Sequence, residues 1–182
     1  GIFREAYTKH QKLSAAVRHY VNALFGAEGL IVVDADCREL KGLFTNVSRE
    51  DVLNNLTSKL VDKTNNSLET LGYKVQVFCR EINFFYLADG IRSRIEHHAD
   101  QFKVLDTGLT FSTTEIEQLI AEEPEKFSPN VILRPLYQEW IMPNLAYVGG
   151  PAEIIYWLQL KEVFQHFNTP FPILMPRNFG MV

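Results

Sequence analysis

The segment Leu145–Glu153, with the sequence LAYVGGPAE, constrains the fold more than any other part of the chain. A short apolar run ends at Gly149 and Gly150, Pro151 follows, and an apolar helical pattern begins. Proline is favoured in the first helical turn, so the pattern predicts a strand, a tight turn and a helix. Glycines allow a sharp turn and the close approach of a ligand, and the free N–H groups at a helix start favour an anion. We therefore expect a ligand-binding turn.

Leu30–Asp34 is a second apolar run, and it ends in an acid. Continuous apolar runs are typical of parallel strands that are buried on both faces. Ligands of open α/β sheets bind beyond the carboxyl ends of such strands, which makes Asp34 and Asp36 candidate binding residues. The alternative is that both acids cap a short helix at about residues 37–41.

Phe171–Pro176 is a third apolar run, and Arg177 and Asn178 follow it. If the three runs lie side by side, an acid, a helix N-terminus and an arginine meet along one rim of a sheet. That combination suits a nucleotide or another charged metabolite. In the last strand–helix–strand unit we expect parallel strands joined by a right-handed crossover.

Glu153 and Arg134 complete the set of candidate binding residues. Glu153 falls in the first turn of a helix predicted over residues 151–167. Its apolar positions cover more than one stripe, which predicts a helix buried on most sides. Glu153 either complements the helix dipole or accepts a hydrogen bond from a ligand. Arg134 begins a short predicted helix and either clamps a carboxylate or phosphate or pairs with Glu139. The sequence assigns no catalytic residue.

The middle of the chain has a different pattern. One long helix is predicted from a cap at Ser48 to about Thr70, and Tyr73–Phe78 alternates as a half-exposed strand does. Short strands are predicted next, at Asn83–Leu87, Ile91–Glu96, Gln101–Leu105 and Leu109–Phe111. Ser112 and Glu115 then form the capping box of another helix. We therefore predict an antiparallel insertion within an α/β fold.

Composition limits the possible partners. The net charge of −4 gives no general basic surface, so nucleic acid is not the expected partner. The two cysteines, without a secretory signal, indicate a reduced, cytoplasmic protein, and the lack of a C-x-x-C pair argues against structural zinc. No apolar run reaches the roughly 18 residues of a membrane span.

A family pattern runs through nearly the whole chain. Its segments are Phe3–Tyr7, Leu24–Asp34, Arg80–Tyr86, Phe127–Glu139, Leu145–Glu153 and Pro172–Arg177. Together they resemble the bacillithiol biosynthesis cysteine-adding enzymes. The SPNVILRPLYQE block, with the VGGP turn after it, is the most specific part of the resemblance.

The resemblance implies a ligase that joins cysteine to the amine of glucosaminyl-malate, with ATP as the expected activating partner. It also implies a Rossmann-like core, related to nucleotidylyltransferases, and a coiled coil that makes the full-length chain a homodimer. The expected fold class is α/β, a partial Rossmann-like parallel sheet with an inserted antiparallel β-rich subdomain. The predicted parts are residues 1–72 (first part of the core plus the long helix), 73–128 (the connecting insertion) and 129–182 (the return to the core).

The family's chains are much longer than 182 residues. They begin with a glycine-rich strand–loop–helix that is expected to supply the other half of the nucleotide site. On this resemblance we expect a middle fragment that holds half a site and is inactive alone. The alternative, from a different class, is a non-catalytic α/β module that binds a nucleotide or a protein. The enzyme hypothesis predicts that Asp34, Glu153 and Arg177 face one cleft.

Overall fold

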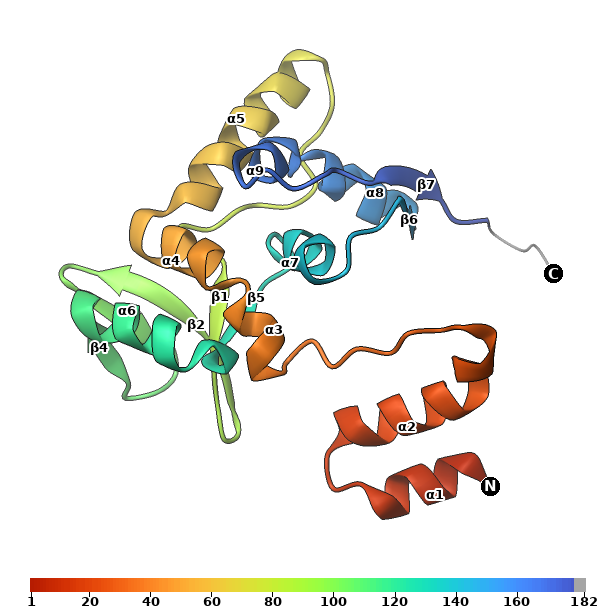
Figure 1. Cartoon of the computed structure of the whole chain (residues 1–182). Helices are drawn as coiled ribbons and strands as arrows, with labels where there is room; N and C mark the ends of the chain where they lie inside the picture. The colour runs from red at the N-terminus through yellow and green to blue at the C-terminus, as the bar shows by residue number, and fades with distance from the viewer. Residues whose placement is uncertain (179–182) are drawn as a thin grey trace. The chain divides into compact units, whose positions relative to one another are not determined.

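The computed structural model describes residues 1–178 and divides the chain into two compact units at Cys37 and Arg38. The first unit is a helical hairpin of α1 (Ile2–Lys9) and α2 (Leu13–Phe25), followed by the short 3-10 turn η1 (Gly26–Glu28) (Figure 1). The small buried side chains Ala6 and Ala16 let the two helices approach closely.

The strand predicted at Leu30–Asp34 is wrong for this structure. The segment has no strand pairing in the described residues, and Ile31 is 71% exposed. Without a neighbouring strand its backbone forms no ladder, and the apolar run alone does not make it a strand. Asp34 Oδ1 instead accepts a hydrogen bond from Asp36 N at 3.2 Å, and Asp34 O accepts one from Cys37 N. The two acids thus lie in a turn directly before residue 38, where a short helix begins, which is close to the alternative that they cap that helix.

The second unit contains a five-stranded antiparallel sheet with the order β4-β3-β2-β1-β5. Its strands are β1 (Phe84–Ala88), β2 (Ile91–His98), β3 (Gln101–Val104), β4 (Thr110–Ser112) and β5 (Phe127–Pro129). The predictions for the first four are confirmed within a residue or two. The turn between β1 and β2 carries Gly90 at φ 69°, where a residue without Cβ fits best.

Several helices bury the main core together with this sheet. They are α3 (Arg38–Gly42), α4 (Thr45–Asn54), α5 (Leu56–Thr70), α6 (Thr113–Glu122), η2 (Pro124–Lys126) and α7 (Arg134–Ile141). Phe44, Phe84 and Phe127 are among its largest fully buried side chains. The capping box at the start of α6 is confirmed, because Ser112 and Glu115 bond each other's backbone N–H groups.

The single long helix predicted over residues 48–70 is wrong. The helix is broken at Asn55, whose φ of 51° lies in the left-handed region, and α5 begins after it. Asparagine tolerates that conformation better than most residues, because its short polar side chain can bond locally. Ser48 lies inside α4, and its hydroxyl donates to Phe44 O instead of capping the helix.

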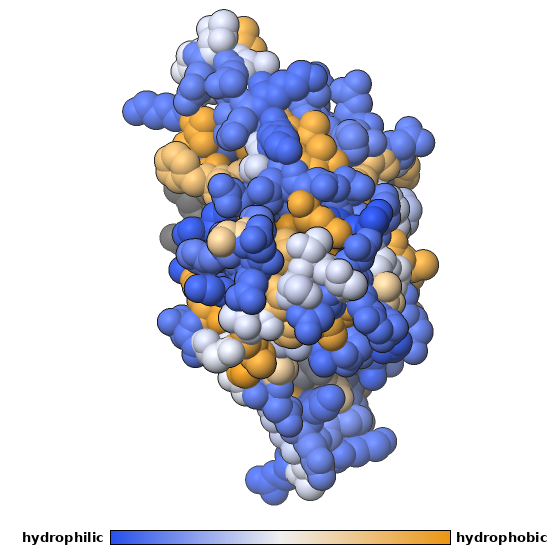
Figure 2. All heavy atoms as spheres, turned by 90° about the vertical axis from the view of Figure 1, so that its left-hand side faces the viewer, coloured by the Kyte–Doolittle hydropathy of each residue, from blue (hydrophilic) through white to orange (hydrophobic). Residues whose placement is uncertain are grey.

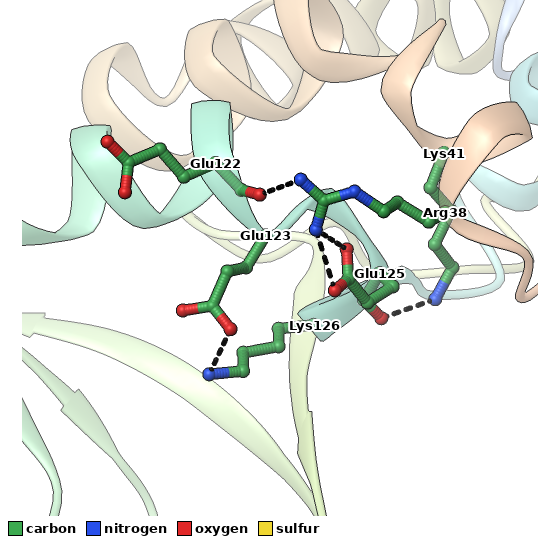
Figure 3. Close-up of polar contacts among 6 residues, drawn as sticks. All are labelled: Arg38, Lys41, Glu122, Glu123, Glu125 and Lys126. Carbon is green, nitrogen blue, oxygen red and sulfur yellow. Dashed lines mark hydrogen bonds and ion pairs between the residues drawn. The ribbon is translucent and has the colours of Figure 1, made fainter.

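A group of polar contacts attaches α3 to the chain after α6 (Figure 3). The Arg38 guanidinium donates to both carboxylate oxygens of Glu125, at 3.0 and 3.2 Å, and also to Glu122 O. Lys41 is only 3% exposed, and its Nζ donates to Glu125 O at 3.0 Å. Residues far apart in sequence are therefore held together where the second unit begins.

The last part of the unit is a parallel two-stranded sheet. The sheet consists of β6 (Ala146–Gly149) and β7 (Ile173–Pro176), and α8 (Pro151–Leu158) and α9 (Lys161–His166) connect the two strands. The predicted strand–turn–helix and the parallel return strand are both confirmed. The single helix over residues 151–167 is not, because it is interrupted at Gln159.

Gln159, where the helix is interrupted, also accounts for another error. Its side chain is 1% exposed, and its Oε1 accepts from Gln76 N and Val77 N, each at 3.0 Å. Its Nε2 donates to Val77 O at 3.0 Å and to Asn65 Oδ1 at 2.8 Å. The prediction of a strand at Tyr73–Phe78 is therefore wrong. One carboxamide supplies the partners that a neighbouring strand would have supplied.

The surface drawn in Figure 2 is mainly hydrophilic, with small separate groups of apolar residues. The short parallel sheet exposes large apolar side chains, since Val148 is 61% and Ile173 69% exposed. On α8, Ile155 and Leu158 are 40% and 46% exposed, so the prediction that this helix is buried on most sides is wrong.

Candidate functional site

The site is built where β6 and β7 end. The two strands run parallel, with Gly149 opposite Pro176, so the residues that follow both strands emerge at the same edge. Arg177 N donates to Gly149 O at 2.9 Å, which continues the ladder by one bond. Arg177 therefore lies against the Gly149–Gly150 turn, as expected from the strand ends.

Close approach explains why both turn positions are glycine. A Cβ on Gly150 would lie 3.2 Å from Arg177 Nη2 and 3.5 Å from Glu153 Oε2. A Cβ on Gly149 would lie 2.6 Å from Tyr147 Cε1, closer than real Cβ contacts come. Because glycine has no Cβ, the Arg177 and Tyr147 side chains can lie directly against the backbone of this turn.

The two glycines are expected to respond differently to alanine. Gly149→Ala forces the Tyr147 ring to move and should destabilise the unit by about 1–3 kcal/mol, as overpacking typically does. Gly150→Ala meets only the flexible ends of Arg177 and Glu153 and should cost clearly less. Thermal unfolding of the two variants of the full-length protein checks the order. Equal losses would contradict the stated contacts.

The Glu153 carboxylate occupies the start of α8. Its Oε2 accepts from Gly150 N at 2.8 Å, and its Oε1 accepts from the Tyr147 hydroxyl at 3.1 Å. The Gly150 bond, followed by those from Tyr147 and the nearby charges of Arg177 and Arg134, holds the pKa of Glu153 below its ordinary value. The sequence predicted a helix start open to an anion. The structure shows that the helix's own carboxylate already bonds one of its N–H groups.

Arg134 lies at the start of α7 and does not pair with Glu139. Its Nη1 donates to Gln138 Oε1 at 2.9 Å, and its Nη2 lies 3.2 Å from the Tyr156 hydroxyl. Its charge contributes to the lowered pKa of Glu153, so both belong to one electrostatic group. Glu139 is buried and accepts hydrogen bonds from Asn144 and, at 3.1 Å, from Gln138 Nε2.

Tyr147 is the main residue that the sequence prediction missed. Its ring stacks on Trp157 with centroids 4.2 Å apart, while its hydroxyl bonds Glu153. Burial, and then the neighbouring Glu153 carboxylate, raise the pKa of the Tyr147 hydroxyl, so it stays a hydrogen-bond donor. A tyrosine inside an apolar strand needs a polar partner, and that requirement was the available signal.

Arg134, Tyr147, Glu153 and Arg177 thus form what we call the rim cluster, at the carboxyl ends of the parallel strands. It presents two guanidinium groups and one carboxylate with a lowered pKa. Guanidinium groups bind phosphate or carboxylate, and a fixed carboxylate accepts from an amine or hydroxyl. This arrangement suits an anionic ligand that also carries hydrogen-bond donors.

The other predicted site residues are not part of the rim cluster. Asn178 is exposed directly after Arg177. Asp34 and Asp36 belong to the first unit, so their sharing a cleft with Glu153 and Arg177 stays a prediction.

Residues 1–178 contain no group of three or more His, Cys, Asp or Glu side chains arranged to hold a metal ion. Within that same range, no helix has both the length and the apolar character needed to cross a bilayer.

The parallel strands, the glycine turn with a helix behind it, and polar residues at the strand ends are features of a Rossmann-like α/β domain. Comparison with protein families agrees with this class. The family described as "Bacillithiol biosynthesis BshC, N-terminal Rossmann-like domain" matches residues 1–178, and the chain belongs to it.

Named relatives support the same family. The chain is 45% identical over 179 residues to a Cytophaga hutchinsonii protein named "Putative cysteine ligase BshC", covering 98% of this chain and 34% of the relative. Proteins with the same name from Flavobacterium johnsoniae and Flavobacterium psychrophilum are 44% and 45% identical. These matches cover 97% and 100% of this chain and 33% and 34% of the relatives. The chain therefore spans about a third of the length of the relatives it matches.

Proposed function

We propose that this chain is part of a cysteine ligase of bacillithiol biosynthesis and that the rim cluster binds an anionic group of its substrates. Family membership supports the pathway. The observation that carries the site is the meeting of Arg177 and Glu153 on the Gly149–Gly150 turn. We further propose ATP, cysteine and glucosaminyl-malate as the substrates, and a homodimer as the full-length assembly.

An amide does not form readily from a free carboxylate, so the carboxyl group of cysteine must first be activated. In the proposed reaction a carboxylate oxygen of cysteine attacks a phosphorus of ATP and displaces pyrophosphate or ADP. The amine of glucosaminyl-malate then attacks the activated carbonyl, loses a proton to solvent, and expels AMP or phosphate. In this scheme the protein holds the charged groups and aligns the amine.

The chain's own residues have distinct proposed roles. Arg177 and Arg134 bind a phosphate or carboxylate through their guanidinium groups. Glu153 holds Tyr147 and Gly150 in place through its two oxygens, so we propose it as a positioning residue. Asp34, Asp36 and Asn178 remain proposed ligand contacts.

Arg177→Ala in the full-length protein is expected to lower kcat/KM by about 10- to 100-fold, because one charge-assisted contact to the bound anion is lost. Arg177→Lys should recover part of the loss, since lysine keeps the charge without the fork of donors. Product formation from cysteine, glucosaminyl-malate and ATP is measured by mass spectrometry. Arg49→Ala is the matched control, because Arg49 is a surface arginine paired with Glu117.

The outcomes separate the two hypotheses. Absence of both product and nucleotide consumption in the wild-type protein would rule out the ligase. Nucleotide binding without turnover would favour the non-catalytic module instead. An unchanged kcat/KM in Arg177→Ala would remove the rim cluster from the site while leaving the ligase intact.

A further inference from the structure

A basic cavity in the first unit has no role in the proposed reaction. It is open to solvent, has a volume of about 330 Å³, and is formed by the α1–α2 hairpin and the segment after it. Its polar lining consists of Lys9, His10, Arg18, His19 and Asn22.

Helical spacing brings these side chains together. Arg18 and Asn22 are four residues apart on α2, with His19 beside them, so all three share one face of the helix. Lys9 ends α1, and His10 follows it directly. The hairpin therefore places the end of one helix next to the polar face of the other.

The lining is positive. In the described residues neither the Lys9 ammonium nor the Arg18 guanidinium is paired with a carboxylate. His10 Nε2 and His19 Nδ1 lie 3.0 Å apart in a hydrogen bond, which fixes both rings. Glu5 lies 3.8 Å from His19 Nε2 but is not part of the cavity lining. The cavity thus offers two cations and further donors without an acid.

Another cavity shows the contrast. It has a volume of about 470 Å³ between the chain before β1 and the edge of β2. Arg80 and Arg94 line it together with Glu81 and Glu96, so its fixed charges balance. It therefore has no preference for an anion, whereas the α1–α2 cavity does.

We propose that the α1–α2 cavity binds a small multiply charged anion of the phosphate class. Unpaired ammonium and guanidinium groups are strong phosphate ligands, and the imidazole and carboxamide groups add hydrogen bonds to phosphate oxygens. The residues of this site belong to the first unit and those of the rim cluster to the second, and the proposal does not depend on the proposed ligase reaction.

Titration of the full-length protein with pyrophosphate, followed by calorimetry, tests this site. Arg18→Ala and Lys9→Ala are each expected to weaken binding about tenfold, the loss of one charge-assisted contact. Arg4→Ala and Lys12→Ala are the matched controls, because they remove exposed charges of the same unit outside the cavity lining, and they should leave binding unchanged. Circular dichroism checks that all four variants fold.

Two further arms identify the source of the phosphate group. Binding of inorganic phosphate that depends on Arg18 supports a free anion as the ligand. Stronger Arg18-dependent binding of AMP supports a phosphate ester. Failure of the wild-type protein to bind any of the three probes at millimolar concentration overturns the proposal. Equal binding by Arg18→Ala and Arg4→Ala overturns it as well.

Discussion

Trp157→Ala is expected to destabilise the second unit by about 3–5 kcal/mol, the usual cost of removing a large buried aromatic side chain. Trp157 is 0% exposed and stacks on Tyr147. It also contacts the rings of Phe164 and Phe171, with centroids 5.9 and 6.1 Å away. Chemical denaturation followed by circular dichroism measures the loss. Because Tyr147 loses its support, we also expect weaker ligand binding at the rim cluster.

Trp157→Phe is the matched control. The indole N–H of Trp157 is buried and has no hydrogen-bond partner in the described residues. Replacing the indole with a phenyl ring therefore breaks no hydrogen bond and removes a buried donor that has lost its contact with water. We expect a cost below about 1.5 kcal/mol, mostly from the smaller ring. A loss as large as that of Trp157→Ala would show that the N–H group has a partner.

Asp51→Ala is expected to cost about 3 kcal/mol at pH 5, because it leaves buried donors without an acceptor. Asp51 is 0% exposed. Its Oδ2 accepts from Asn83 N at 2.6 Å, and its Oδ1 accepts from Asn83 Nδ2 at 3.1 Å. Asn83 in turn accepts from Asn130 Nδ2 at 3.0 Å, so the loss spreads to the chain before α7. Asp62→Ala, at an exposed position of α5, is the control and should be nearly neutral.

The cost of Asp51→Ala should depend on pH. Burial is the largest cause that raises the pKa of Asp51 from 3.8 to about 6, against the hydrogen bonds from Asn83. The folded state then binds the proton more tightly than the unfolded state. The stabilisation from this group is full below about pH 4 and is lost as the pH rises through 6, by roughly 3 kcal/mol in all. The difference between wild type and variant in denaturation midpoint should narrow as the pH rises from 4 to 7. A gap that widens with pH would contradict the raised pKa.

Features that depend on neighbouring residues in sequence were predictable. The capping box of Ser112 and Glu115 and the turn before Pro151 follow from local chemistry alone. The meeting of Gly149–Gly150 with Arg177 was also predictable, because a strand–helix–strand unit returns its second strand beside the first. These rules supplied Glu153 and Arg177 of the rim cluster.

Features that depend on distant residues were not predictable. Leu30–Asp34 carries the apolar pattern of a strand, but a strand also needs a partner, and its own sequence does not supply one. The break at Asn55 interrupts an apolar stripe that reads as continuous along the sequence. The bond between Tyr147 and Glu153 depends on how tightly β6 approaches α8, which no pattern encodes.

The carboxamide of Gln159 gives the segment after α5 an unusual kind of order. A strand in a sheet is released gradually, as its ladder frays from one end. Here the N–H groups of Gln76 and Val77 share a single acceptor atom, and the same side chain binds Val77 O. One rotamer change of Gln159 would therefore remove the partners of all three groups together. The order of this segment thus depends on the packing of one buried side chain between α8 and α9.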